Sequence, residues 1–456
     1  MAEPACSAED RAALLSFKAG IEKDTTGILS SWVGTECCGA WEGIECHPNT
    51  GRVIALQLQS PQADARSYMK GTVSPSLGSL PFLQALVISN MKEITGTIPQ
   101  SLANLSQLTQ LYLENNMLQG PIPSNLGVLA SLKVLSLSGN KLQGELPSTL
   151  GLITGLIQIN VGMNLLTGSV PKTFMNLHAL ESLDLSHNAF SGAIPGFIGQ
   201  FQNLTLLDMS YNQFSGQIPI SLCSLSRVLD LSFSHNKLTG VIPSQIGSLK
   251  SLSSLSLSVN LLNGSIPESF AELQKLWFLD LSWNRFSGSL PAGLGKGLHS
   301  LISIDLSYSN LSLGSVPDWL RKRALIRDIH LSACQIQGPL PTFLFPDSLN
   351  SIDLSNNRIT GQIPSSISKM SNLQRLDLSR NLLNGSIPET MGEIESLFTD
   401  PSLLYHALSW LFTPRTQPFL EYFVGLLRSL LSSLPEIRVL RRCSLFEFRG
   451  NKYIIT

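Results

Sequence analysis

The sequence has few charged residues, and none of its apolar runs is long enough to cross a membrane. Asp, Glu, Lys and Arg together make up 14% of its 456 residues, against roughly 25% in an average globular protein. The formal net charge is −1, and no basic stripe of the kind that nucleic-acid binding requires is present. No stretch of about 18 residues is both apolar and uncharged. We therefore expect neither a nucleic-acid partner nor a transmembrane span within this chain.

The familiar signatures of enzymes and of export are also absent. Without a glycine-rich phosphate loop, HExxH or GxSxG, we expect no catalytic activity, no cofactor and no metal. The N-terminal stretch MAEPACSAEDRAALLSFKAGI lacks the apolar core of a secretory signal. Clustered cysteines and N-x-S/T sequons are nevertheless typical of secreted proteins, so we expect an extracellular, cell-wall or cell-surface location and a signal peptide removed or lost upstream of Glu3. The five predicted glycosylation sites are Asn104, Asn203, Asn263, Asn310 and Asn384.

What the chain contains instead is a repeat. The segment LDLSHNAFSGAIP is followed by LDMSYNQFSGQIP, and the pattern LxxLxLxxNxLxGxIPxxL gives thirteen clear units after a degenerate one from Val53 to Pro75. A period of roughly 20–29 residues with this leucine spacing indicates a leucine-rich repeat solenoid. Asparagines recur every 24 residues at Asn116, Asn140, Asn164, Asn188, Asn212, Asn236, Asn260 and Asn284, and the pattern continues through Ser309, Cys334, Asn357 and Asn381.

Each repeat predicts one coil of the solenoid. Leu183 and Leu185 alternate with the outward Asp184, which is the pattern of a short strand. Fourteen such strands, about 4.8 Å apart, would form a parallel sheet on the concave face on the order of 65 Å long. The repeated asparagine turns inward, where its amide satisfies backbone groups that would otherwise be buried and unpaired. Cys334 takes the asparagine position and Cys223 lies in a convex segment, so we expect both to be structural.

The first 52 residues differ from the repeat and predict an N-terminal cap. Ser7 with Asp10 matches a variant of the capping box, and apolar residues at positions 14, 17 and 21 recur at helical spacing. The segment SSWVGTECCGAWEGIEC follows, with two tryptophans and three cysteines. The adjacent Cys37 and Cys38 cannot easily pair with each other.

These segments resemble a known family. The run CSAEDRAALLSFK, the pattern W-x8-W-x-G-I-x-C with its CC pair, and the GxIP repeats resemble plant extracellular leucine-rich repeat proteins over residues 6 to about 397. That group contains receptor-like proteins, ectodomains of receptor-like kinases and polygalacturonase-inhibiting proteins. The resemblance implies disulfides Cys6–Cys37 and Cys38–Cys46, a right-handed superhelix, and a lateral sheet near LxGxIP. The variant VPDWLRKRALIRDIHLSACQIQGPLP is most similar to members without a kinase, and no kinase motif follows it.

The predicted organisation is a cap at 1–52, about 14 coils of about 24 residues at 53–397, and a non-repeat tail at 398–456. Asp400 and Pro401 stand where the next core leucine is due, so the repeat stops within a coil. We interpret the tail as altered splicing or a change of reading frame rather than a native cap. The alternative is an amphipathic helix, FLEYFVGLLRSLLSSL at 419–434, lying on the open end or on a membrane surface.

Two columns of outward residues are candidates for ligand binding on the concave face. Immediately before the repeated asparagine stand His187, Tyr211, His235, Val259, Trp283 and Tyr308. Earlier in the strands stand Asp184, Asp208, Asp280, Asp305, Asp353 and Asp377. The aspartates could equally be the family consensus LDLS, and the first column could be chance variation in a tolerant position. Two coils separate the histidines by roughly 10 Å, too far for a shared metal.

With enzyme signatures absent, the sequence predicts a non-catalytic recognition module. The first hypothesis is a receptor-like protein that binds a peptide or protein and acts with a receptor-like kinase in defence or development signalling. The alternative is a secreted inhibitor of a cell-wall-degrading hydrolase, similar to the polygalacturonase inhibitors. A transmembrane segment in the full transcript would favour the first hypothesis, and a short cysteine-capped end would favour the second.

Overall fold

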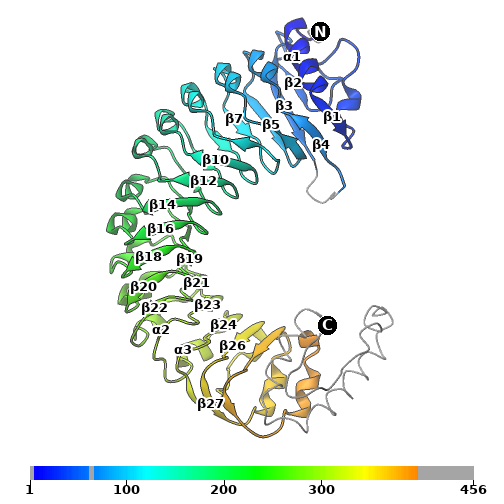
Figure 1. Ribbon diagram of the computed structural model, residues 1–456. Helices are drawn as coiled ribbons and strands as arrows, with labels where there is room; N and C mark the ends of the chain where they lie inside the picture. The colour runs from blue at the N-terminus through cyan, green and yellow to red at the C-terminus, as the bar shows by residue number, and fades with distance from the viewer. Residues whose placement is uncertain (1–4, 61–65, 399–456) are drawn as a thin grey trace, which may run out of the picture.

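The computed structural model describes residues 5–60 and 66–398 of the chain. Over these residues the protein is an α/β repeat solenoid whose coils stack into a curved arc, with the N-terminal cap at one end (Figure 1). Strands line the inner, concave side of the arc, and short helices lie on its outer, convex side. The predicted fold class is confirmed.

The main sheet forms the concave face and has fifteen strands. β2 is antiparallel to β3, and the remaining fourteen strands, β3 to β28, are parallel. Adjacent coils pair in the same register, so Leu183 lies beside Leu207 and Asp184 beside Asp208. The strands, in spatial order, are β2 (Ile44–Cys46), β3 (Val53–Gln59), β5 (Ala85–Ser89), β7 (Gln110–Tyr112), β9 (Val134–Ser136), β11 (Gln158–Asn160), β13 (Ser182–Asp184), β15 (Leu206–Asp208), β17 (Asp230–Ser232), β19 (Ser254–Ser256), β21 (Phe278–Asp280), β23 (Ser303–Asp305), β24 (Asp328–His330), β26 (Ser351–Asp353) and β28 (Arg375–Asp377).

A second, lateral sheet follows the asparagine of each coil, as the family resemblance implied. The glycine of GxIP ends its strands in the left-handed region, for example Gly216 at φ 77°, which a residue without a Cβ adopts freely. Its eight strands are β8 (Gln119–Gly120), β10 (Lys141–Glu145), β12 (Leu165–Gly168), β14 (Ala189–Ala193), β16 (Gln213–Gly216), β18 (Lys237–Gly240), β20 (Leu261–Gly264) and β22 (Arg285–Phe286). Two smaller sheets flank it: β1 (Ile21–Asp24), β4 (Met69–Thr72) and β6 (Lys92–Thr95), and β25 (Gln337–Pro339), β27 (Arg358–Gly361) and β29 (Leu382–Leu383).

The convex side is built from single turns of helix that pack closely on one another. A Cβ added at Gly199 would lie 2.1 Å from the carbonyl oxygen of Ser221 in the next coil, so only glycine allows this approach. The α-helices are α1 (Ala8–Ala19), α2 (Leu294–Gly297) and α3 (Asp318–Arg321). The 3-10 helices are η1 (Ile28–Ser31), η2 (Pro75–Ser79), η3 (Gln100–Asn104), η4 (Ser124–Val128), η5 (Ser148–Leu152), η6 (Lys172–Asn176), η7 (Gly196–Gln200), η8 (Ile220–Ser224), η9 (Ile246–Ser248), η10 (Glu268–Glu272), η11 (Pro346–Ser348), η12 (Ser365–Lys369), η13 (Glu389–Glu393) and η14 (Glu395–Phe398).

The repeated asparagine ties each coil to the one before it. The Asn212 amide nitrogen donates to the carbonyls of Leu185, Met209 and Ser210 at 2.9, 3.2 and 2.9 Å. Its oxygen accepts from the Phe190 N–H at 2.9 Å. Because these backbone groups lie beside the leucine core, they have no water to bond to, and the asparagine side chain supplies the missing partners.

Two coils use a different residue at this position. The Ser309 hydroxyl donates to the Leu281 carbonyl at 2.8 Å, and the Cys334 thiol lies 3.3 Å from the Leu306 carbonyl. Burial raises the pKa of the Cys334 thiol to about 12, and that of Cys223 to about 11. Both thiols are buried and free, which confirms their predicted places inside the ladder and in the convex segment η8.

The cap packs α1 against the first coils, but Ser7 does not cap it. The Ser7 side chain makes no capping hydrogen bond, so the predicted capping box is wrong. Asp10 is fully buried and instead accepts from both the Arg52 guanidinium and the Val53 N–H, at 2.8 and 2.9 Å. The carboxylate therefore joins the helix to the first strand of the solenoid, because a buried charge requires a paired cation.

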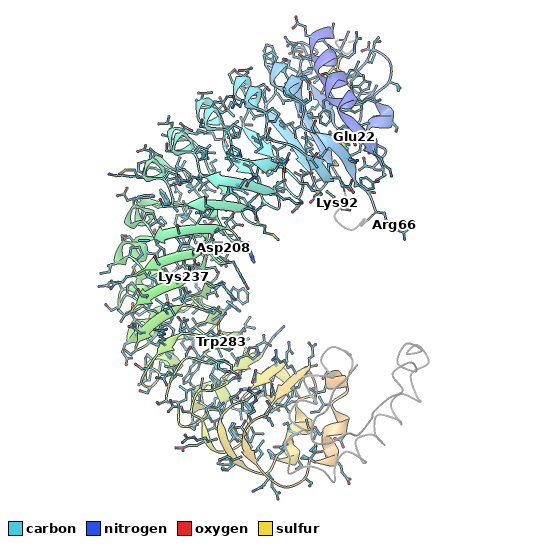
Figure 2. All side chains as sticks on the ribbon, in the orientation of Figure 1. Glu22, Arg66, Lys92, Asp208, Lys237 and Trp283 are labelled. Atoms are coloured by element: carbon cyan, nitrogen blue, oxygen red, sulfur yellow. A yellow bond between two sulfur atoms is a disulfide. The ribbon has the colours of Figure 1, made fainter. Side chains whose placement is uncertain are left out.

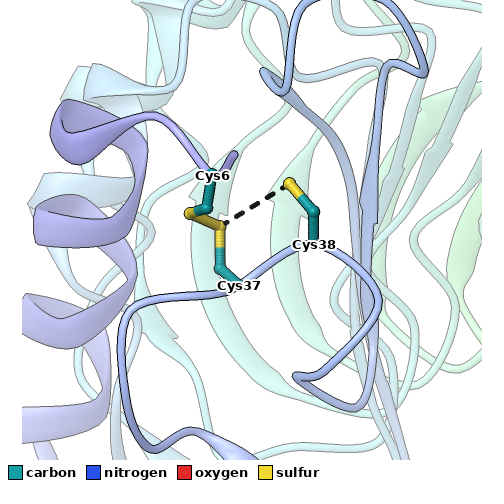
Figure 3. A group of neighbouring side chains, drawn as sticks. All are labelled: Cys6, Cys37 and Cys38. Atoms are coloured by element: carbon teal, nitrogen blue, oxygen red, sulfur yellow. Dashed lines mark hydrogen bonds between the residues drawn. A yellow bond between two sulfur atoms is a disulfide. The ribbon is translucent and has the colours of Figure 1, made fainter. Parts of the chain in front are cut away.

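Cysteines and tryptophans complete the cap. The disulfides Cys6–Cys37 and Cys38–Cys46 are formed, as the family resemblance implied. Figure 3 shows the first of them, with the Cys38 sulfur 4.0 Å from that of Cys37. Since these sulfurs are oxidised, they offer no thiolate to a metal ion. The rings of Trp32 and Trp41 stack with centroids 5.3 Å apart, and both are buried, so these tryptophans belong to the core.

The predicted tail lies outside the described residues from position 399 onward, and so does the amphipathic segment 419–434. Within 5–60 and 66–398, no helix has both the length and the apolar character needed to cross a bilayer. The boundaries of the cap and of the repeat region remain predictions.

Replacing Asn212 by alanine should lower the free energy of unfolding by about 2–4 kcal/mol, because several buried backbone groups lose their partner. Asn212→Ser should lower it less, since a hydroxyl can still reach one carbonyl, as Ser309 does. Urea unfolding followed by circular dichroism measures both variants. Equal stability of all three proteins would show that the amide ladder does not hold the coils together.

Peptide mapping without reduction should recover Cys6 with Cys37 and Cys38 with Cys46. Cys223 and Cys334 should stay thiols that alkylate slowly near neutral pH until the protein unfolds, because their pKa values of about 11 and about 12 leave almost no thiolate. A disulfide that contains either of these two cysteines would contradict their placement.

Candidate functional site

The concave face carries a column of bulky side chains on an unusual backbone. We call His187, Tyr211, His235, Val259, Trp283 and Tyr308 the aromatic column. All six lie in the left-handed region, with φ between 50° and 53°. L-residues with a Cβ rarely adopt this conformation, and a β-branched residue such as Val259 does so least readily. Asn115 and Asn356 hold the same position in other coils with φ of 51° and 56°.

The turn after each strand produces this backbone. The Tyr211 N–H donates to the Ser234 carbonyl of the next coil at 2.9 Å, and the Asn212 N–H donates to the His235 carbonyl at 3.1 Å. The left-handed residue therefore continues the hydrogen-bond ladder while the chain turns the asparagine side chain inward. As a consequence, the side chain before the asparagine projects outward onto the concave face.

The rings of the aromatic column stack on one another. The ring centroids of His187 and Tyr211 are 4.0 Å apart, those of Tyr211 and His235 3.9 Å, and those of Trp283 and Tyr308 4.1 Å. The rings within each pair are within 18° of parallel. Because the ring faces contact each other, the column presents mainly ring edges to solvent. Tyr211 is 43% and Trp283 56% exposed, and Trp283 points into the hollow of the arc (Figure 2).

The aspartates form a row beside this column, which we call the acidic row. The register places Asp184 beside Asp208 and Asp280 beside Asp305. Each aspartate of the acidic row accepts a hydrogen bond from the backbone N–H two residues further on, as Asp208 does from Ser210 at 2.9 Å. The row comprises Asp184, Asp208, Asp280, Asp305, Asp353 and Asp377.

The aspartates consequently have a structural duty, as the consensus interpretation of LDLS expects. The bond shapes the turn that follows each strand. It uses one carboxylate oxygen. The second oxygen faces His330 in Asp305 and Arg375 in Asp353, at 3.6 Å in both cases. Burial raises the pKa of Asp208, because the partly desolvated carboxylate loses stabilising contact with water.

His330 belongs to this row and was not among the predicted site residues. It lies between Asp305 and Asp353 in the sheet, with Nδ1 3.6 Å from Asp305 Oδ2 and Nε2 2.8 Å from the Ser351 hydroxyl. Burial lowers its pKa, but the hydrogen bond and charge of Asp305 and the charge of Asp353 outweigh burial and raise it. Aligning the segment DIHLS with LDLS places His330 at the position of the aspartate, so the sequence alone could have identified His330 as a member of this row.

One histidine of the aromatic column, His235, has a shifted pKa. The pKa of His235 is lowered, chiefly by burial, although the charge of Asp280 opposes this. Tyr211 lies between the imidazoles of His187 and His235. The structure therefore brings together the predicted His187, Tyr211 and His235, and separately Trp283 and Tyr308, with Val259 at the intervening position.

The five predicted glycosylation sites all lie at the surface. Asn104 ends η3, Asn263 is in β20, and Asn310 and Asn384 lie near the lateral sheets, all four exposed. Asn203 is partly exposed, and its amide donates to the His178 carbonyl at 3.2 Å. None of them lies in the concave strands or in the aromatic column.

The concave face is thus a long, curved sheet that carries a column of rings beside a row of carboxylates. The model described as "Leucine rich repeat N-terminal domain" matches residues 7–47. Models described as "Leucine rich repeat" match residues 107–129, 130–190, 154–214, 226–286 and 347–399. The chain belongs to the leucine-rich repeat family, and it is similar to plant members of that family.

Curated relatives match about a quarter of the chain. The DNA damage-repair/toleration protein DRT100 of Arabidopsis thaliana is 36% identical over 25% of this chain and 32% of its own length. The polygalacturonase inhibitor of Vitis vinifera is 35% identical over 24% and 30%, respectively. The receptor-like protein EIX2 of Solanum lycopersicum is 38% identical over 24% and 11%. The matched part of the chain thus spans about a third or less of these relatives.

Solved structures are similar over far more of the chain. The ectodomain of the receptor kinase GASSHO1/SCHENGEN3 from Arabidopsis thaliana, in complex with CASPARIAN STRIP INTEGRITY FACTOR 2, has a TM-score of 0.76 and 32% identity. That match covers 84% of this chain and 46% of the other. The Arabidopsis receptor kinase HAESA, with the peptide hormone IDA and the co-receptor SERK1, has a TM-score of 0.63 and 28% identity, covering 86% and 76%.

His330 and His235 should titrate on opposite sides of the ordinary histidine pKa of about 6.5. The raised pKa of His330 gives stability that is present below about 6.5 and lost as pH rises through the raised value. The lowered pKa of His235 has the opposite effect, costing stability as pH falls below about 6.5. NMR titration of the imidazole C2 protons, assigned by single substitutions, measures both pKa values.

Asp305→Asn should bring the pKa of His330 down, because the asparagine keeps the oxygen that accepts from Ser307 but removes the neighbouring charge. Asp377→Asn, at the other end of the acidic row, serves as the matched control. An unchanged His330 pKa in the Asp305 variant would contradict the assigned cause.

Proposed function

We propose that this protein is a non-catalytic extracellular recognition module. It binds a peptide or protein segment along the concave face and acts with a kinase-bearing partner in defence or development signalling. The observation that carries the proposal is the aromatic column: a line of stacked rings, partly exposed, at positions where the backbone favours asparagine or glycine.

The column has the properties of a set of interface anchors. Aromatic side chains bury a large area on binding, and tyrosine and tryptophan are the residue types most enriched among binding hot spots. Stacking already holds the rings of Tyr211 and Trp283 in place. Ordering them on binding therefore costs little conformational entropy, which favours affinity.

The comparisons support a peptide ligand and a kinase-bearing partner. The receptor ectodomains to which this chain is similar over most of its length are described as complexes, and that of HAESA contains both a peptide hormone and a co-receptor. By similarity we assign a peptide or protein ligand to this chain, and a receptor-like kinase as its signalling partner.

An extracellular location is part of the proposal. The two cap disulfides require an oxidising compartment such as the cell surface or cell wall. The five surface sequons are accessible to glycosylation, and their absence from the concave strands would leave the aromatic column uncovered by glycans.

A second candidate function is inhibition of a cell-wall-degrading hydrolase. The observation that favours it is the 35% identity to the polygalacturonase inhibitor of Vitis vinifera. The same concave face would then cover the active-site cleft of an enzyme rather than hold a short peptide.

A double substitution of Tyr211→Asn and Trp283→Asn tests the role of the column. Peptides selected from a random display library on the natural protein should bind the variant at least thirtyfold more weakly, about 2 kcal/mol, the hot-spot scale. Thermal stability should be kept or raised, because asparagine tolerates the left-handed backbone, as at Asn115 and Asn356. Fluorescence anisotropy measures binding, and circular dichroism measures stability.

Val128→Asn, a matched change of a residue 67% exposed on the convex helix η4, should leave binding unchanged. If the double variant keeps full binding while Leu165→Asn on the lateral strand β12 abolishes it, the concave face is not the working surface. In parallel, purified polygalacturonase is assayed with the protein added. Inhibition that the column variant abolishes would establish the second candidate function instead.

A further inference from the structure

The middle of the concave sheet has carboxylates but no cationic side chain. The seven consecutive strands β11 to β23 contain five aspartates, and no lysine or arginine occurs in any of them. The chain as a whole is nearly neutral, with a formal net charge of −1, so this concentration of one sign is local. The five are Asp184, Asp208, Asp230, Asp280 and Asp305.

Four of these five carboxylates have no ion-pair partner within the part of the chain that the structure describes. Asp184, Asp208, Asp230 and Asp280 form no ion pair there, and the ion pairs of the sheet involve Asp305 with His330 and Asp353 with Arg375. Lys237, seven residues after Asp230, begins the lateral strand β18, where its ammonium donates to Gln213.

Asp208 of the acidic row and Asp230 of strand β17 are partly buried, which makes the absence of a neighbouring cation significant. Burial raises the pKa of Asp208 and of Asp230, so their charged forms are poorly solvated in the free protein. Asp184 and Asp208 each accept a backbone N–H on one carboxylate oxygen, at 2.9 Å. The second oxygen of Asp280 lies 3.5 Å from the Ser256 hydroxyl, and that of Asp305 lies 3.6 Å from His330 Nδ1, so an external cation would share these two oxygens with groups of the protein. A cationic group from outside would regain the lost electrostatic stabilisation.

The aromatic column limits how that cation binds. The ring faces of Tyr211 and its neighbours contact one another, so they are closed to a cation that would sit over a ring. Around Tyr211, cationic groups of the ligand therefore meet the carboxylates of the acidic row, while its apolar side chains lie against the ring edges. The two surfaces run side by side across the strands, since His187, Tyr211, Trp283 and Tyr308 each stand three positions after an aspartate; serine holds that position before His235 and Val259.

We infer that the ligand of the concave face is a basic, extended segment whose lysine or arginine side chains reach the acidic row while its apolar side chains cover the aromatic column. This inference rests on the proposed function and names the chemistry of the partner. The carboxylates form two adjacent pairs, Asp184 with Asp208 and Asp280 with Asp305. Four strand spacings of about 4.8 Å separate the pairs, and an extended chain covers that distance in about six residues.

The ligand should accordingly carry two basic positions about six residues apart. Two synthetic peptides test this: one of alternating apolar and serine residues with lysines at that spacing, and the same peptide with glutamates in place of the lysines. The lysine peptide should bind with an affinity that falls as salt is added, because the contacts are charged. The glutamate peptide should not bind.

The decisive variant replaces four aspartates by asparagine: Asp184, Asp208, Asp280 and Asp305. Asparagine keeps the oxygen that accepts from the backbone, so the strands and turns remain while the charge is lost. We expect binding of the lysine peptide to weaken at least tenfold and to lose most of its salt dependence. The matched control replaces four convex or exposed acids by glutamine, with the same change in net charge: Glu268, Glu272, Glu389 and Glu393.

The outcomes separate this inference from the proposed function. If the peptides selected from the display library depend on Tyr211 and Trp283 but are neutral or acidic, the proposed function stands and the basic ligand is wrong. Equal weakening by the concave and the convex quadruple variants would also overturn it, since the effect would then be one of net charge. Selected peptides that ignore the column altogether would overturn the proposed function itself.

Discussion

The buried asparagine ladder is the constraint on which the rest of the structure depends. A coil of leucines closes only if the backbone groups that turn inward find partners, and one amide per coil supplies several of them, as Asn212 does for Phe190, Leu185 and Met209. The amide bonds to its own coil and to the preceding one, so it also sets their register. Repetition at a nearly constant spacing follows, 24 residues from Asn116 to Asn284, and the coils of slightly different length through Ser309, Cys334 and Asn357 still place the ladder side chain beside a carbonyl of the preceding coil.

The ladder also shapes the concave surface that we propose as the binding face. To bring Asn212 inward, the chain must place Tyr211 in the left-handed region at φ 51°, and this projects the tyrosine side chain outward. The same geometry recurs in each coil, so outward side chains align into columns with the spacing of the strands. Packing inside the coil and binding outside it are therefore two consequences of a single turn, and variation outside leaves the interior intact.

The fold could be predicted from the sequence because leucine and asparagine positions carry it directly, and the outward columns followed from the same register. Other features depend on contacts between coils that no single repeat encodes. The stacking of His187 on Tyr211 requires the strand spacing, and the role of Asp208 in the turn requires the backbone. The local motif at Ser7 predicts a helix cap, but the Ser7 side chain makes no capping bond. Asp10 instead pairs with Arg52, because its buried carboxylate requires a cation.

The aromatic column combines a backbone cost with a gain from ring stacking. Six side chains with a Cβ in the left-handed region cost about 1 kcal/mol each, or about 6 kcal/mol in total. Three stacked ring pairs return about 1 kcal/mol each, so stacking offsets about half of the strain. Asparagine at the same positions would avoid the strain without disturbing the ladder, as Asn115 and Asn356 do. Met163, Ala333 and Arg380 carry the same strain in other coils, so strain alone does not assign a role to the column. The binding role that we propose therefore depends on what only the column has, namely rings that are both stacked and partly exposed.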